Sequence, residues 1–173
     1  ARRTKFLSGP HGSTTWIGRP EGQEGSIVMS VCGNALFGQI ELKDEGYKIE
    51  PVRDTNAHRI FKLDHDKEVP IDEGGLIPPE YQFPEKKDTI PSIPKGTDDG
   101  AVFDVLVLYT KGFAEAYPGD ELYAQINYLV GVANACYSNS EVNLTSRVAG
   151  IRKVNYKDNG KMGDSLDDLT NGS

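Results

Sequence analysis

The first third of the chain alternates apolar and polar residues with a period of two. Turn residues such as Gly33-Asn34 separate five short segments with this alternation. A period of two places every other side chain on one face of a strand, and tight turns join antiparallel neighbours. The pattern therefore predicts an antiparallel β meander with strands at Thr14–Gly18, Ser26–Cys32, Ala35–Leu42, Gly46–Val52 and His58–Leu63. A β unit of about 60 residues is near the lower limit for folding alone, so we expect it to pack against another part.

From residue 66 to 100 the alternation disappears, and prolines and glycines accumulate. Proline removes an amide donor and fixes φ, so such a segment is typical of an extended connector. We therefore predict three regions: a β-rich domain at 1–65, a proline-rich linker at 66–100 and a third region at 101–173.

The third region carries a strand, a helix and a second strand. Residues 102–109 form an almost continuous apolar run, which is typical of a central strand covered on both faces. Val142–Tyr156 alternates again, and a strand, helix and strand in this order predict a parallel pair. The whole chain is then α+β. The helix is predicted over Gly119–Ser138, with one apolar stripe that would bury Leu122, Ile126, Leu129, Ala133 and Cys136.

Net charge and the length of the apolar runs exclude two classes of partner. The 173 residues carry a formal charge of -7, which argues against a nucleic-acid partner, because phosphate binding needs a basic surface. Apolar runs stay far short of the roughly 20 residues that cross a bilayer, so we expect no membrane partner. The start lacks the apolar core of a signal peptide, so we expect a soluble chain from which any targeting segment has been removed.

The candidate chemical groups are few. Cys32 and Cys136 fit either one disulfide or two buried free thiols. Asn143 and Asn171 begin glycosylation triplets. Asp64-His65-Asp66 with Glu68 could attract a cation, although a solvated turn explains these residues better. Acidic residues near the end are better explained as helix-start carboxylates than as a catalytic pair: Asp164, Asp167 and Asp168.

Three segments of the third region carry a resemblance to a known family. Phe103–Thr110, Ala133–Ser140 and Val142–Tyr156 resemble the start of the catalytic domain of reprolysin-like metallopeptidases, in the metzincin clan. Thr14–Arg19 and Tyr47–Pro51 resemble the β-rich propeptide region that precedes such domains. The resemblance implies an incomplete metzincin-like α/β unit, truncated before the zinc motif.

Zinc-binding helices of this clan carry His-Glu-x-x-His. The histidines of this chain, His11, His58 and His65, form no such run, so no catalytic residue or metal ligand is assigned to it. Zinc is expected in the intact parent protein. Cys32 is a weak candidate for the thiolate by which some propeptides block zinc.

The resemblance therefore implies the N-terminal, non-catalytic portion of a secreted zinc metalloendopeptidase, with a latency and scaffold role. Its partner would be the remainder of the catalytic domain, and the linker would be either an activation cleavage site or a simple spacer. The alternative is a non-enzymatic extracellular protein with a protease-like scaffold, which works as a structural or binding part of an assembly.

Overall fold

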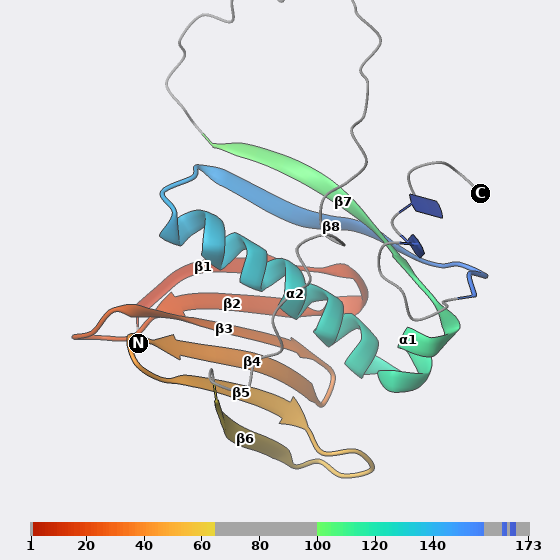
Figure 1. Cartoon of the computed structure of the whole chain (residues 1–173), viewed down its shortest axis with the longest axis horizontal. Coiled ribbons are helices and arrows are strands. Elements are labelled where there is room, and N and C mark those ends of the chain that lie inside the picture. Colours follow the sequence, from red (N-terminus) through yellow and green to blue (C-terminus); the bar gives the residue numbers. More distant parts are fainter. Residues whose placement is uncertain (1, 65–99, 158–163, 166, 169–173) are drawn as a thin grey trace, which may run out of the picture.

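Three layers make up the described part of the molecule, with a long helix between two sheets (Figure 1). The computed structural model describes residues 2–64, 100–157, 164–165 and 167–168. The proposed linker at 66–100 therefore lies almost entirely outside the described residues, and the division into domains stays a prediction.

The first layer is a six-stranded antiparallel sheet in which neighbours in sequence are neighbours in space. The five predicted strands are present, and the sheet gains one more at its edge, Arg2–Ser8, which pairs with Thr14–Arg19. A short 3-10 helix, η1 (Pro10–Gly12), joins these two strands. The strands are β1 (Arg2–Ser8), β2 (Thr14–Arg19), β3 (Gly25–Cys32), β4 (Ala35–Leu42), β5 (Gly46–Pro51) and β6 (His58–Leu63).

The third layer is the predicted parallel pair, β7 (Ala101–Tyr109) and β8 (Leu144–Lys153). Two helices connect these strands, α1 (Lys111–Ala116) and α2 (Asp120–Asn139). The Thr110 side chain caps α1 by accepting from the Phe113 amide. The strand-helix-strand prediction is confirmed, and the α+β class with it.

Helix α2 forms the middle layer and is buried on two sides. Leu122 and Ile126 pack against the parallel pair, whereas Ala124, Tyr128 and Ala135 pack against the six-stranded sheet. The single predicted stripe was partly wrong, because a helix between two sheets needs two buried faces. Leu129, which was expected inside, is 51% exposed.

The prediction that β7 is covered on both faces was also wrong. Its odd-numbered positions from Val105 to Tyr109 turn towards α2, but Val102 is 61% exposed and Leu106 is 62% exposed. Within the described ranges, α2 covers only one face of this strand. The apolar run of β7 shows that the strand is suited to burial on both faces. In the described structure, only the face towards α2 is covered.

No helix among the described residues has both the length and the apolar character required to cross a membrane.

Candidate functional site

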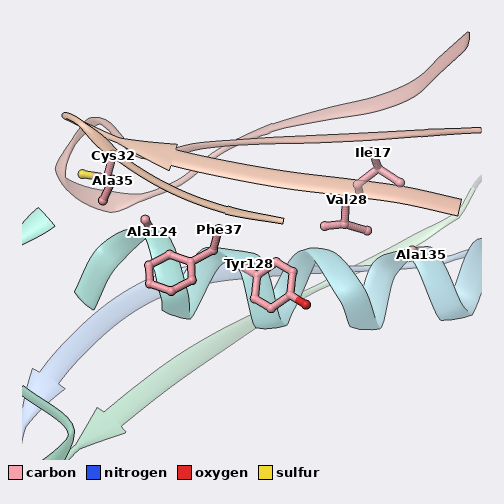
Figure 2. Packing of buried hydrophobic residues seen from close by; sticks show 8 residues of the cluster. All are labelled: Ile17, Val28, Cys32, Ala35, Phe37, Ala124, Tyr128 and Ala135. Atoms are coloured by element: carbon pink, nitrogen blue, oxygen red, sulfur yellow. The ribbon is translucent and has the colours of Figure 1, made fainter. Parts of the chain in front are cut away.

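A core of buried apolar side chains lies between α2 and the six-stranded sheet (Figure 2). Ile17 and Val28 project from β2 and β3 towards the helix, and Phe37 projects from β4 towards Ala124 and Tyr128. Alternation along each strand brings these side chains to one face, and small residues on α2 let the layers approach closely. Sheet and helix therefore share one apolar core.

At Gly131 the helix lies close to this sheet. A Cβ atom added to Gly131 would lie 2.6 Å from Thr15 Cγ2 and 2.9 Å from Val28 Cγ1, which is too close for any side chain. Glycine is needed here because of the neighbouring strands and not because of its own backbone conformation. The packing of α2 on β2 and β3 depends on this single missing methyl group.

Buried hydrogen bonds fix the helix on the sheet. Asn127 Nδ2 donates to Ser13 Oγ at 2.7 Å, and the Thr15 hydroxyl donates to the Asn127 carbonyl at 3.3 Å. At the adjacent residue, the Tyr128 hydroxyl donates to Gln39 Oε1 at 2.6 Å. A buried polar group that loses its partner is costly, so these bonds set the register of helix on sheet.

The electrostatic setting of Tyr128 follows from its position. Burial, together with the smaller effect of the negative charges of Glu41 and Glu50, raises the pKa of the Tyr128 phenol from its ordinary value of about 10 to about 12. The phenol therefore stays protonated at neutral pH and acts as a hydrogen-bond donor.

Cys32 lies at the end of β3, beside the N-terminus of α2. Its thiol donates to the His11 carbonyl at 3.4 Å and to Asp120 Oδ1 at 3.9 Å. Burial raises the pKa of this thiol, and the adjacent Asp120 carboxylate raises it further. A zinc-blocking cysteine must act as a thiolate, so these features favour a structural thiol and lend no support to the switch prediction.

Of the two alternatives for Cys32 and Cys136, the structure has the free thiols and not the disulfide. Cys32 contacts Asp120 at the start of α2, and Cys136 lies sixteen residues further along that helix. At 1.5 Å per residue this is about 24 Å, whereas a disulfide joins Cα atoms about 4–7 Å apart. Cys136 is also exposed, so its predicted place in the core was wrong.

The opposite side of α2 is pinned to β8 by Asn134. This side chain donates from Nδ2 to the Ser146 carbonyl at 2.9 Å and accepts the Ser146 amide at 2.8 Å. Asn134 belongs to the helix segment that carries the family resemblance, and its side chain is almost fully buried. The structure gives this residue a scaffold role, because it ties the helix to the second strand of the pair.

A second concave region lies at the carboxyl ends of β7 and β8. Ligands of open α/β sheets bind outside these strand ends. The depression here has a volume of about 630 Å³ and is lined by Thr110–Phe113 and by Asn155–Lys157. The Tyr156 hydroxyl lies near its rim and contacts Ser165 Oγ at 3.3 Å and Asp168 Oδ2 at 2.7 Å.

Residues suited to zinc are not gathered at this depression. Within the described ranges, no group of three His, Cys, Asp or Glu side chains could hold a metal ion. His11 stacks on Tyr123 with ring centroids 3.9 Å apart, and His58 accepts the Leu36 amide at 3.1 Å. Among the residues that the structure describes, this depression is therefore a concave edge without a set of side chains suited to zinc.

An apolar groove runs beside β7 on the side of α2. It has a volume of about 370 Å³, and its lining comes from the end of β7, from Phe113 of α1 and from Ile126, Leu129 and Val130 of α2. The groove and the exposed outer face of β7 are two apolar surfaces that the described residues leave without cover.

The remaining predicted site residues are scattered. Asn143 is exposed immediately before β8, not inside a strand, and its carbonyl accepts the Ala101 amide at 3.1 Å. Asp164, Asp167 and Asp168 fall in helical residues, as predicted. Asn171 and the group His65, Asp66 and Glu68 lie outside the described residues.

Sequence reasoning missed Asn127 and Asn134, the residues that hold α2 to its two neighbours. Two asparagines at helix interior positions on the border between apolar stripes were the available signal, because asparagine is a poor helix former and is seldom buried without partners.

Comparison with known proteins agrees with this scaffold. Residues 100–173 match the family described as Metallo-peptidase family M12B Reprolysin-like. A peptidyl-Asp metalloendopeptidase of Stenotrophomonas maltophilia strain R551-3 is 26% identical, and the alignment covers 100% of this chain and 44% of that protein. The protein of the same name from strain K279a is 25% identical, over 92% of this chain and 41% of its own length.

The chain thus spans less than half the length of these curated relatives, and no solved structure matches it. The resemblance seen in the sequence is confirmed over residues 100–173, which are similar to the reprolysin-like metallopeptidases.

Proposed function

We propose that this chain is the N-terminal, non-catalytic portion of a secreted zinc metalloendopeptidase. Its role is to form the scaffold of the catalytic unit and to keep the precursor latent. The observation that carries the proposal is the reprolysin-like match of a strand-helix-strand unit whose outer strand is still uncovered.

The uncovered surface of β7 is suited to the remainder of the catalytic domain. Val102, Leu106 and Leu108 present an apolar outer face, and the groove beside Leu129 continues it on the helix side. Surfaces of this kind normally pack against further secondary structure. Downstream elements of the parent would cover them and complete the sheet.

The zinc site belongs to that downstream part. When bound, zinc would polarise the scissile carbonyl and acidify a water molecule. Because the described residues hold no suitable ligand set, this chain orients the frame and takes no part in the chemical step. From the printed names of the relatives, we infer that the parent cleaves peptide bonds beside aspartate.

The test compares this chain with the longer protein from the same gene. The longer protein is expected to bind one equivalent of zinc and to cleave an aspartate-containing peptide, whereas residues 1–173 should do neither. Stoichiometric zinc or cleavage with residues 1–173 alone would contradict the proposal.

The mass of the native protein tests the alternative assembly role. A mature chain of 18.9 kDa that binds no zinc would favour the non-enzymatic scaffold over the peptidase. A larger mass, with a downstream His-Glu-x-x-His peptide, would support the peptidase.

A further inference from the structure

We propose that the six-stranded sheet stays bound to the strand-helix-strand unit after the chain is cut between residues 64 and 100. The sheet is then a lasting partner of α2 and not a detachable inhibitor. The proposal rests on the proposed function only where it concerns latency, because attachment depends on the contacts of this chain alone.

Each piece buries apolar side chains against the other, although the strand-helix-strand unit also has a small core between α2 and the parallel pair. Domains are built from at least two packed layers, and the six-stranded sheet has α2 as the layer on its inner face. Without that helix, Ile17, Val28 and Phe37 would face water. Without the sheet, Ala124 and Tyr128 would be exposed on a remnant of about 74 residues (100–173), a size at which a single core supplies little stability.

Polar contacts join the two pieces along their whole length. Hydrogen bonds at the middle of α2 come from Ser13, Thr15 and Gln39. At one end Lys5 Nζ of β1 donates to Thr145 Oγ1 of β8 at 2.6 Å, so the sheet also touches the parallel pair directly. At the other end Arg53 Nη2 donates to the Ala116 carbonyl at 3.1 Å.

Shape complementarity adds specificity to this surface. Gly131 lets β2 and β3 approach the helix, and Gly9 makes a similar close approach to the Asn127 side chain. Since both glycines are fitted to a residue of the other piece, the two surfaces match at more than one point. The partner that this sheet surface fits is therefore α2 itself.

One consequence concerns latency. If the sheet remains attached after a cut, then a cut alone does not end latency by releasing it. Release would require unfolding of the sheet or proteolysis within its strands.

The experiment uses the whole chain with a recognition sequence for a site-specific protease inserted within residues 66–99. After complete cleavage, size-exclusion chromatography and native mass spectrometry report whether both fragments travel together. We expect one species with the mass of both fragments and an unchanged elution volume, and a single thermal transition. Separate fragments, or aggregation of the cut chain, would overturn the proposal.

Matched glycine variants test whether the α2 surface is responsible. Gly131→Leu should raise the fraction of separated fragments at least tenfold, because the new side chain meets β2 and β3. Gly112→Ala on α1 is the control, since a Cβ there meets only Thr110 Oγ1 at 3.8 Å, and it should leave the complex intact.

A milder pair keeps the test decisive if Gly131→Leu fails to fold. Tyr128→Phe and Lys5→Ala each remove one contact between the pieces, and each should speed fragment exchange several-fold. Unchanged exchange in both variants would contradict the assigned surface. No readout involves zinc or peptide cleavage, so failure here is distinct from failure of the proposed function.

Discussion

The two sides of α2 differ in how completely the layers that they contact are packed. Towards the six-stranded sheet, the helix meets a closed interface with apolar packing, buried hydrogen bonds and a glycine at close approach. Towards the parallel pair it is held by Asn134, but the strands beyond it are bare on their outer face. The first interface is complete within this chain, and the second is suited to more protein.

Truncating one large apolar side chain on each side should separate the two most clearly. Phe37 is 2% exposed, whereas Leu106 is 62% exposed on the outer face of β7. We expect Phe37→Ala to lower the free energy of unfolding by about 3–5 kcal/mol, because it leaves a cavity in the shared core. Leu106→Ala should change it by less than about 0.5 kcal/mol. Urea unfolding followed by circular dichroism measures both.

An equal loss of unfolding free energy in Phe37→Ala and Leu106→Ala would contradict the difference between the closed and the open side. In the longer parent protein, Leu106→Ala should become clearly destabilising, because downstream elements then cover β7. If its effect stays negligible there, the outer face is not where the remainder packs.

The tie between α2 and β8 should give the next largest effect. Asn134→Ala leaves the buried Ser146 amide without its side-chain acceptor, and we expect a loss of about 2 kcal/mol in unfolding free energy. Asn139→Ala, at the exposed end of the same helix, serves as the control and should lie within about 0.5 kcal/mol of the native protein. Similar values for both variants would mean that Asn134 does not hold the helix to the strand.

Tyr128 gives the closed interface a pH dependence. At neutral pH, Tyr128→Phe should cost about 1 kcal/mol through loss of the bond to Gln39. From about pH 10 to about pH 12 the native protein keeps a phenol proton that the unfolded chain releases, so native stability falls as pH rises. The variant lacks this proton, and its stability should fall less steeply over the same interval.

Urea unfolding at a series of alkaline pH values measures this difference. Parallel curves for the native protein and the variant would show that burial does not hold the proton on Tyr128.

The smallest effect is expected on the open face of the pair. Arg147 donates from Nε to Asp104 Oδ1 at 2.8 Å and from Nη2 to Oδ2 at 3.0 Å, but both side chains are more than half exposed. Exposed ion pairs contribute little, so Arg147→Ala should cost less than about 0.5 kcal/mol in this chain. A double-mutant cycle with Asp104→Ala measures the coupling, and a value above about 1 kcal/mol would contradict the picture of an open face.

The antiparallel sheet was the most predictable part, because alternation and tight turns are local signals. The strand at Arg2–Ser8 escaped prediction because charged residues at its start hide the alternation, and the register shifts between Arg3 and Lys5. The parallel pair and α2 were predictable as elements for the same local reasons. Their burial was not, since it depends on which layers meet each face.

Less of the candidate site than of the fold could be predicted from the sequence. The distance between Cys32 and Cys136 follows from the placement of β3 at one end of a long helix, which no residue pattern encodes. The hydrogen bonds of Asn127 and Asn134 likewise require knowledge of the strands that face them. By contrast, the sequence alone shows that it contains no His-Glu-x-x-His run, because such a motif occupies five consecutive residues.

The close fit at Gly131 also bears on recombination among relatives. A chimera that exchanges the first 64 residues for those of a distant homologue would set foreign strand side chains against a helix surface shaped for Thr15 and Val28. Such swaps should succeed only when the matching helix face is transplanted with them, so the natural crossover point lies beyond α2 and not at the proline-rich segment.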